Sequence, residues 1–72
     1  MDFASAYISM KRGHKVKRKH WEGYWIMENG EVIMHCRDGR VINVRDSDDM
    51  DYTISNMACD DWEIADVYKK EE

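Results

Sequence analysis

The sequence predicts an α+β fold, in which one short N-terminal helix packs on a small antiparallel sheet of four or five strands with two tight hairpins. Asn29-Gly30 and Asp38-Gly39 predict the hairpins, because each pair is flanked by residues that favour strands and such pairs are strong signals for two-residue turns. Apolar residues at helical spacing near the N-terminus predict the helix. With 72 residues, no proline, no repeat and no linker, the chain is expected to form a single domain, residues 1–72.

The helix is expected over residues 3–12. Asp2 is a favourable N-cap, and apolar residues follow at helical spacing from Phe3 to Met10. Gly13 supplies the left-handed conformation that commonly ends a helix. The apolar stripe of this helix is therefore expected to form part of the core.

The rest of the chain is predicted to be mainly strands. These strands are expected near residues 15–18, 24–28, 31–37, 40–45 and 61–68. Between the last two, the acidic stretch DSDDMD (46–51) is expected to be a loop, and YTISNMA (52–58) a turn or a short helix. The tail 69–72 is expected to be frayed.

The small size of the chain favours self-association. A chain of this length buries only about 60% of the surface that its unfolded form exposes. Cys36 and Cys59 are too few for a disulfide framework, and no apolar run has the length of a signal peptide or a membrane span. We expect a cytoplasmic homo-oligomer, because the predicted strands are apolar on both faces and only one face can pack on the helix.

The charge is distributed unevenly around a formal net charge of -4. Residues 1–20 carry six cations against one acid, whereas residues 46–72 carry two cations against ten acids. Such asymmetry fits either a basic nucleic-acid-binding arm with an acidic tail, or two ends that neutralise each other within or between subunits.

Arg18 is the first candidate for ligand binding. Side chains alternate along a strand, so an inward-facing Val16 places Arg18 on the inner face too, next to Trp21. A half-buried guanidinium needs a partner. That partner is either the carboxylate of Asp60 or Asp61, or the phosphate of a ligand, which an arginine fork binds bidentately.

Four large aromatic residues form the second candidate group. Trp62 lies inside a strand pattern and is expected in the core, whereas Trp21 lies in a turn beside Gly23 with room to stack on a flat ligand. Tyr24 and Trp25 either join the core or an interface, or extend this platform. Stacking of one base on an aromatic side chain contributes about 1–3 kcal/mol.

The sequence offers no pattern for metal binding or catalysis. The three histidines and two cysteines lack the paired spacing of zinc sites. The acidic stretch 46–51 lacks the glycine and glutamate of a calcium loop, since Asp51 and Met57 hold those positions. No nucleophile elbow, P-loop or dinucleotide fingerprint is present. We therefore expect a binding protein that is not an enzyme and has no metal or cofactor.

Two segments resemble a known family. DFASAYISMKRGHKVKRKHW resembles its opening, an amphipathic helix with a lysine-glycine end followed by a basic-valine-basic strand and a tryptophan. ISNMACDDWEI resembles its closing segment, in which an acidic pair precedes a tryptophan and a last strand. The family is the Thoeris anti-defence type 2 group of short phage proteins, and the resemblance covers residues 2–23 and 54–64. The chain departs from it after Trp21, where Glu22-Gly23-Tyr24-Trp25 replaces an asparagine-glycine-lysine type of turn.

The resemblance implies a homotetramer that acts as a sponge for immune signals in the infected bacterial cell. Members sequester a cyclic ADP-ribose isomer made by Thoeris TIR-domain proteins, and some also hold cyclic oligonucleotides made by CBASS cyclases. They bind the signal without cleaving it. No long nucleic acid and no membrane is expected as a partner.

The residues and the resemblance together predict one ligand site between subunits. Its expected residues are Arg18, Trp21, Tyr24, Trp25, Ser55, Asn56, Asp60 and Asp61, of which the last four would read ribose hydroxyls or an adenine amino group. The alternative is an acidic phage protein that binds and blocks a host protein through residues 46–66. An enzyme that hydrolyses the signal would need a metal or a nucleophile that the sequence does not offer.

Overall fold

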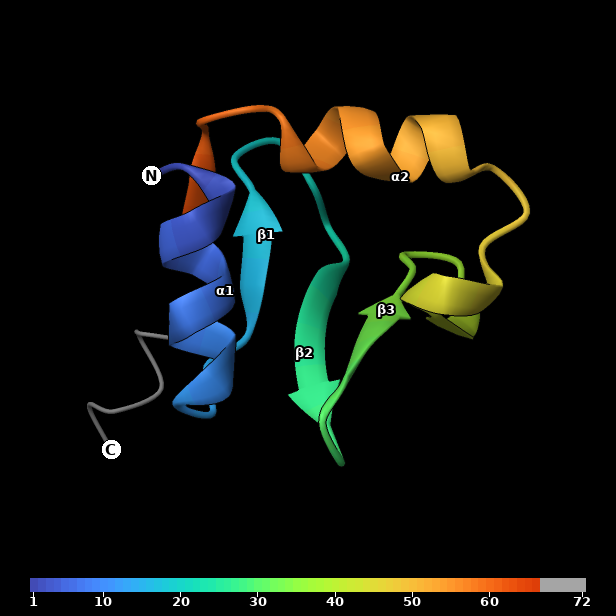
Figure 1. Cartoon of the computed structure of the whole chain (residues 1–72), viewed down its shortest axis with the longest axis horizontal. Helices are drawn as coiled ribbons and strands as arrows, with labels where there is room; N and C mark the ends of the chain where they lie inside the picture. The colour runs from blue at the N-terminus through green and yellow to red at the C-terminus, as the bar shows by residue number, and fades with distance from the viewer. Residues whose placement is uncertain (67–72) are drawn as a thin grey trace.

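The computed structural model describes residues 1–66 as two helices and a five-stranded sheet (Figure 1). The elements in chain order are α1 (Phe3–Lys11), β1 (Val16–Arg18), β2 (Tyr24–Glu28), β3 (Glu31–His35), β4 (Val41–Asn43), the 3-10 helix η1 (Val44–Asp46), α2 (Met50–Met57) and β5 (Trp62–Ile64). The α+β prediction is therefore confirmed.

The sheet has the strand order β4-β3-β2-β1-β5, and every pairing is antiparallel. The turn between β2 and β3 consists of Asn29 and Gly30, with φ of 54° and 79°. Positive φ at both positions is typical of the hairpin turn that matches the twist of the strands. This turn places Tyr24 opposite His35, and the predicted hairpin is confirmed in position.

Helix α1 begins and ends close to where the sequence predicts. The Asp2 side chain accepts a hydrogen bond from the Ser5 amide at 2.9 Å, which satisfies one of the free amides of the first turn. The helix ends at Lys11, and Gly13 follows with φ of 97°, a left-handed conformation that glycine adopts at little cost.

The core lies between α1 and the three strands β1, β2 and β5. Its buried apolar residues are Ala6, Met10, Val16, Trp25 and Trp62. Phe3 joins this core from α1, with its ring centroid 5.8 Å from that of Trp25 and 5.1 Å from that of Trp62. The expected role of Trp62 in the core is confirmed, since only 2% of its surface is exposed.

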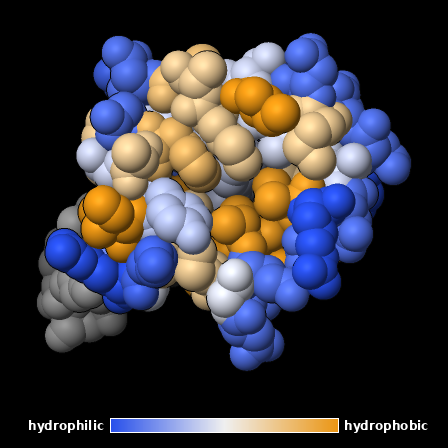
Figure 2. All heavy atoms as spheres, in the orientation of Figure 1, coloured by the Kyte–Doolittle hydropathy of each residue, from blue (hydrophilic) through white to orange (hydrophobic). Residues whose placement is uncertain are grey.

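Apolar side chains are exposed mainly on the helices. Tyr7 and Ile8 of α1 and Met50 and Ile54 of α2 are among the exposed large apolar residues. Figure 2 shows apolar side chains across the face formed by the two helices and the part of the sheet between them. None of the helices within residues 1–66 has the length and apolar character needed to cross a lipid bilayer.

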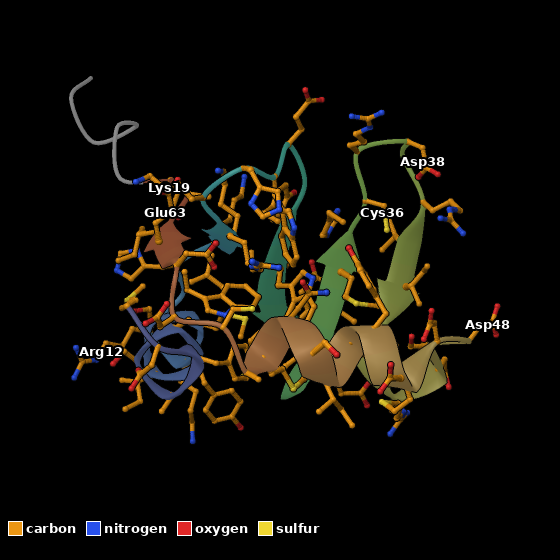
Figure 3. All side chains as sticks on the ribbon, turned by 90° about the horizontal axis from the view of Figure 1, so that it is seen from above. Arg12, Lys19, Cys36, Asp38, Asp48 and Glu63 are labelled. Carbon is orange, nitrogen blue, oxygen red and sulfur yellow. The ribbon has the colours of Figure 1, made fainter. Side chains whose placement is uncertain are left out.

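Both helices cover the same face of the sheet (Figure 3). Val16, Trp25 and Trp62 are buried on this face, towards α1. Arg18 follows Val16 at the spacing of a strand and meets Asn56 of α2 on the same face. The other face of the sheet is not covered by a helix of the described chain.

The structure corrects several of the predicted boundaries. The strand expected at 31–37 ends at His35, so the connection to β4 is longer than the two-residue turn expected at Asp38-Gly39. The strand expected at 40–45 ends at Asn43, because its side chain accepts a hydrogen bond from the Arg45 amide at 3.0 Å and the chain turns into η1. The acidic loop expected at 46–51 is shorter, because Asp49 caps α2 by accepting from the Tyr52 amide at 3.0 Å.

The last expected strand is only partly within the described chain. β5 comprises Trp62–Ile64, which is shorter than the expected 61–68. Residues 67 and 68 of that strand and the tail 69–72 lie outside the described residues.

Candidate functional site

A cavity of about 380 Å³ opens at the end of the sheet where α2 passes over it. This volume is within the range of small-molecule sites. The lining residues come from the β1–β2 connection, from the paired ends of β2 and β3 with the residues that follow, and from α2. They are His20, Trp21, Glu22, Gly23, Tyr24, Trp25, Met34, His35, Cys36, Arg37 and Tyr52.

Gly23 lets the β1–β2 connection lie directly against the end of β3. A Cβ atom at this position would overlap the carbonyl oxygen of His35 and lie 3.2 Å from the Arg37 amide nitrogen. Only glycine allows such a close approach of two backbones. The residue that the sequence suggested would leave room for a ligand therefore serves to join two walls of the cavity.

Trp21 is the tryptophan best placed to meet a ligand. It is half-buried and lines the cavity, with its ring centroid 5.7 Å from that of Trp25 and 5.2 Å from that of Trp62. Trp25 also lines the cavity, but only 4% of its surface is exposed and it belongs to the core. The two buried tryptophans thus hold Trp21 in place.

Tyr24 is held in a stack on the uncovered face of the sheet. Its ring lies on that of His35, its cross-strand neighbour, with centroids 4.6 Å apart and planes 13° apart. The ammonium group of Lys15 lies 4.7 Å from the centroid of Tyr24, at the distance of a cation–π contact. Tyr24 and His35 line the cavity, but their stacked rings lie on the face of the sheet away from α2.

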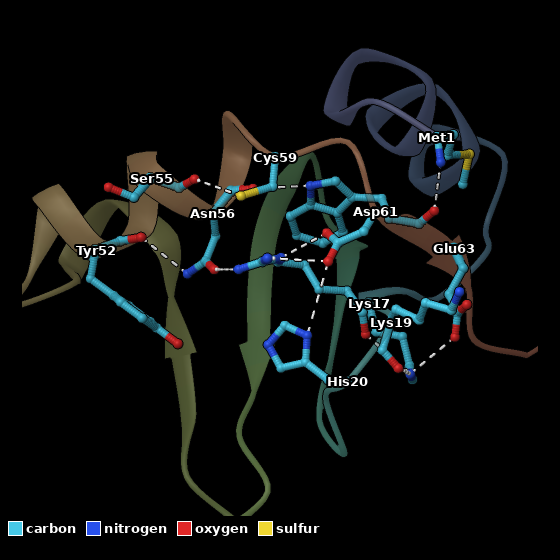
Figure 4. A network of polar contacts seen from close by, with 12 residues as sticks. Met1, Lys17, Lys19, His20, Tyr52, Ser55, Asn56, Cys59, Asp61 and Glu63 are labelled. Atoms are coloured by element: carbon cyan, nitrogen blue, oxygen red, sulfur yellow. Dashed lines mark hydrogen bonds and ion pairs between the residues drawn. The ribbon is translucent and has the colours of Figure 1, made fainter.

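Arg18 is engaged by protein groups on three of its nitrogens (Figure 4). Its Nε and one terminal nitrogen donate to the two carboxylate oxygens of Asp61 at 2.8 and 3.1 Å, and the other terminal nitrogen donates to Oδ1 of Asn56 at 2.8 Å. Of the two carboxylates considered from the sequence, Asp61 is the partner. Arg18 is not among the residues that line the cavity.

The contact between Arg18 and Asp61 shifts the pKa of both side chains. The hydrogen bonds from Arg18 hold the pKa of the Asp61 carboxyl below its ordinary value of 3.8, and the hydrogen bond to Asp61 raises the pKa of Arg18. His20 stands at the edge of the cavity, with Nδ1 3.9 Å from an Asp61 oxygen. The pair is therefore a charged contact at neutral pH, and His20 is its neighbour among the residues that line the cavity.

Asn56 makes three hydrogen bonds, two of which connect α2 to the sheet. Its side-chain oxygen accepts from Arg18, and its side-chain nitrogen donates to the Tyr52 carbonyl oxygen within α2 at 3.0 Å. Its own backbone carbonyl accepts from the indole nitrogen of Trp62 at 3.0 Å. Because Asn56 is buried and uses both ends of its amide, the structure places it as an anchor of α2.

The remaining expected residues lie away from the cavity. Ser55 is exposed on α2, and its carbonyl oxygen accepts a hydrogen bond from the Cys59 thiol at 3.4 Å. Asp60 is exposed, and neither it nor Ser55 lines the cavity. Of the eight expected ligand residues, the structure thus brings together Trp21, Tyr24 and Trp25 as cavity wall.

Eight of the lining residues were not part of the predicted ligand site. Among them, the residues best suited to stack on a flat ligand or to donate to an anion are His20, His35, Arg37 and Tyr52. Arg37 is exposed and has no ion-pair partner among residues 1–66, so its guanidinium is available to an anion. The hairpin register contained a signal for His35 and Arg37, because a two-residue turn at 29–30 places residues 35–37 beside residues 22–24.

The arrangement is suited to binding a flat, anionic molecule. Aromatic rings provide stacking surface, and Arg37 with the two histidines provides hydrogen-bond donors for an anion. Within residues 1–66, no group of three or more His, Cys, Asp or Glu side chains is placed to hold a metal ion. Comparison of the chain with models of protein families, with curated proteins and with solved structures found no match.

Proposed function

We propose that this protein is a phage anti-defence sponge, which captures a cyclic nucleotide immune signal and holds it without cleaving it. The candidate ligands are cyclic ADP-ribose isomers of Thoeris systems and cyclic oligonucleotides of CBASS systems. The observation that carries the proposal is the cavity that Trp21 and Tyr52 line together with Arg37, which has no ion-pair partner within residues 1–66. The resemblance at both ends of the sequence narrows the ligand class to cyclic signals.

The proposed binding combines stacking with charge-assisted hydrogen bonds. Stacking on aromatic side chains contributes about 1–3 kcal/mol per base. A hydrogen bond from Arg37 to a phosphate oxygen adds roughly 1.5–3 kcal/mol. Nanomolar capture needs about -12 kcal/mol, so one open cavity needs further contacts, which a neighbouring copy would supply. The overall negative charge disfavours long polyanions, whereas the local positive charge admits a compact one.

A thermal-shift screen with isothermal titration calorimetry tests the proposal. We expect one class of cyclic nucleotide to raise the melting temperature, because a ligand that binds only the folded state stabilises it. Heating the complex should then release the messenger with unchanged mass. Absence of binding by every cyclic dinucleotide, cyclic trinucleotide and cyclic ADP-ribose isomer would contradict the proposal, and release of a cleaved product would indicate a hydrolase.

A second candidate function rests on the acidic surface at the start of α2. Asp46, Asp48 and Asp51 are exposed and have no ion-pair partner within the described chain. Such a surface fits a protein that blocks a basic, nucleic-acid-binding surface of a host protein. This function predicts a protein partner in a pull-down from host lysate and an association that salt weakens strongly.

A further inference from the structure

The net charge of the cavity depends on the protonation of one histidine. Among the side chains that line the cavity, Glu22 is an acid and Arg37 is a base, so their charges offset each other at neutral pH. His35 also lines the cavity, but its ring is stacked on Tyr24 on the face of the sheet away from α2. The protonation of His20 therefore decides whether the cavity is neutral or positive.

His20 stands beside a carboxylate that favours its charged form. Its Nδ1 atom lies 3.9 Å from an oxygen of Asp61, which is too long for a hydrogen bond but close enough for opposite charges to attract. Arg18 donates to both oxygens of Asp61, at 2.8 and 3.1 Å, and holds the carboxylate in this position (Figure 4). When the ring is protonated, its other nitrogen, Nε2, can donate to an anion in the cavity.

We propose that His20 is a ligand-binding residue whose protonation couples the capture of a phosphate-bearing ligand to pH. The imidazolium donates a hydrogen bond from Nε2 to a phosphate oxygen, and Arg37 supplies a second cation in the same cavity. Asp61 is a positioning residue, because it acts on the ligand through His20. The identity of the ligand as a cyclic nucleotide rests on the proposed function, whereas the role of His20 follows from the cavity and the ion pair.

Binding is expected to take up a proton from solvent. A phosphodiester keeps its single negative charge throughout the range in which histidine titrates, so it neither supplies nor removes a proton. Bound phosphate favours the imidazolium, because it places a second negative charge beside His20 in addition to that of Asp61. The affinity should therefore rise as the pH falls through the region around 6.5, and level off where His20 is already protonated in the free protein.

The other groups around His20 do not account for such a dependence. Carboxylates and guanidinium groups keep their charge in this pH region, and thiols and phenols stay neutral. These groups are Asp61 and Arg18 beside the ring, and Glu22, Arg37, Cys36 and Tyr52 in the cavity. His35 titrates in the same region, but its Nε2 atom faces Glu28, with 3.8 Å to a carboxylate oxygen. The two histidines are distinguished by their separate NMR signals.

Histidine NMR with sulfate tests the inference without a nucleotide. Sulfate is a suitable probe, because it is an anion that does not titrate in this pH region. At about pH 6, sulfate should shift the ring signals of His20 and bind roughly tenfold more tightly than at about pH 8, on the other side of the histidine titration. His14 is the matched control, because it pairs with Asp66 at 3.4 Å but does not line the cavity.

Point variants assign the effect to His20 and Asp61. His20→Gln keeps a polar side chain that cannot be protonated, so it should bind sulfate equally at both pH values. His14→Gln should keep the dependence of the wild type. Asp61→Asn should move the response of His20 to lower pH, which a loss of structure alone would not do. Circular dichroism of each variant establishes that it is folded.

Calorimetry with cyclic dinucleotides separates this inference from the proposed function. Titrations in two buffers with different heats of ionisation should show proton uptake on binding by the wild type and none by His20→Gln. Cyclic dinucleotide binding without pH dependence would overturn the role of His20 and leave the sponge intact. A pH-dependent sulfate response without binding of any cyclic nucleotide would do the reverse. Equal sulfate binding at both pH values, or an unchanged dependence in His20→Gln, would also overturn the inference.

Discussion

Arg18 and Asp61 show how a residue pair that looked like a ligand site serves the fold. One hypothesis from the sequence was that the Arg18 guanidinium binds a ligand phosphate. In the structure it instead donates hydrogen bonds to the Asp61 carboxylate and to the Asn56 side chain. A half-buried arginine without such partners would be costly. The contact therefore joins β1 and α2 to Asp61, the residue that precedes β5.

This pair makes the stability of the protein sensitive to acid. The folded-state pKa of Asp61 lies below its ordinary value of 3.8, so the pair's contribution is complete above that value and is lost as the pH falls through the folded-state pKa. We expect Asp61→Asn to lower the free energy of unfolding at neutral pH, with a difference from the wild type that shrinks in acid. Urea unfolding over a pH series measures this difference. A difference that stays constant with pH would contradict the assignment.

Gly23 is expected to tolerate no side chain. In Gly23→Ala the new methyl group would overlap the His35 carbonyl oxygen, so the β1–β2 connection must move away from β3. Overpacking of this kind costs roughly 1–3 kcal/mol. Urea unfolding should show this loss, and Glu22→Ala, at the exposed neighbouring position, should leave the free energy of unfolding nearly unchanged.

Tyr52 lines the cavity but was not among the ligand residues predicted from the sequence, and its substitution tests the cavity. It is exposed and lines the cavity from α2, so we expect Tyr52→Ala to weaken cyclic nucleotide binding by the free energy of one stacked base, roughly 1–3 kcal/mol. Tyr7→Ala is the matched control, because Tyr7 is an exposed tyrosine on α1 outside the cavity. Equal affinities of both variants in calorimetry would show that ligand does not contact this wall. Trp21→Ala should weaken binding in the same assay.

Among the elements, α2 depends most on a single residue, Asn56, for its position on the sheet. A helix this short is unstable in isolation, because its nucleation is unfavourable. Two hydrogen bonds hold α2 over the sheet. The Asn56 side chain accepts one from Arg18, and the Asn56 backbone carbonyl accepts the other from the Trp62 indole. Because α2 also carries Tyr52, the position of this helix sets one wall of the cavity.

Removal of the Asn56 side chain is expected to loosen α2 before the rest of the sheet. Asn56→Ala leaves the Arg18 group without one acceptor, which costs about 1–3 kcal/mol. Hydrogen exchange should become faster for the amides of Met50–Met57 than for those of β2 and β3. Ser55→Ala, at the exposed neighbouring position, is the control and should exchange as the wild type does. A uniform increase across the whole chain would indicate global destabilisation without a local role.

Local signals predicted most of the elements, and long-range contacts account for what they missed. Asn29-Gly30 predicted the central hairpin, and its two-residue turn fixes which residues of β2 and β3 face each other. The strand expected at 40–45 ends at Asn43, because the Asn43 side chain accepts a hydrogen bond from the Arg45 amide. Ser, Asp and Asn compete with regular structure in this way, and a residue count does not reveal it.

The residues of the candidate site also fall into those that a local pattern predicts and those that long-range contacts place. Trp21 and Tyr24 were predicted because an aromatic pair beside a glycine is a local pattern. The part played by Tyr52 follows from where α2 lies, which is decided by contacts between Asn56, Arg18 and Trp62 far apart in the sequence. No local pattern carries that information.

The molecule as a whole is a two-layer domain in which one aromatic cluster links the first helix to the last strand. Phe3 of α1 contacts Trp25 of β2 and Trp62 of β5, and Trp21 packs on both tryptophans from the β1–β2 connection. Large aromatic side chains contribute much buried area in few residues. A chain this short can therefore bury enough apolar area for a core with only a few large residues.

The pairing of β1 with β5 leads to an expectation for the order in which the strands form. Lys17 and Glu63 face each other although 46 residues separate them, whereas β2 and β3 are joined by a two-residue turn. Closing a long loop costs more entropy than closing a short one, so the hairpin should form in the transition state and β5 should dock after it. In stopped-flow kinetics, Ile33→Val should mainly slow refolding and Ile64→Val should mainly accelerate unfolding. The opposite pattern would mean that the two ends of the chain meet first.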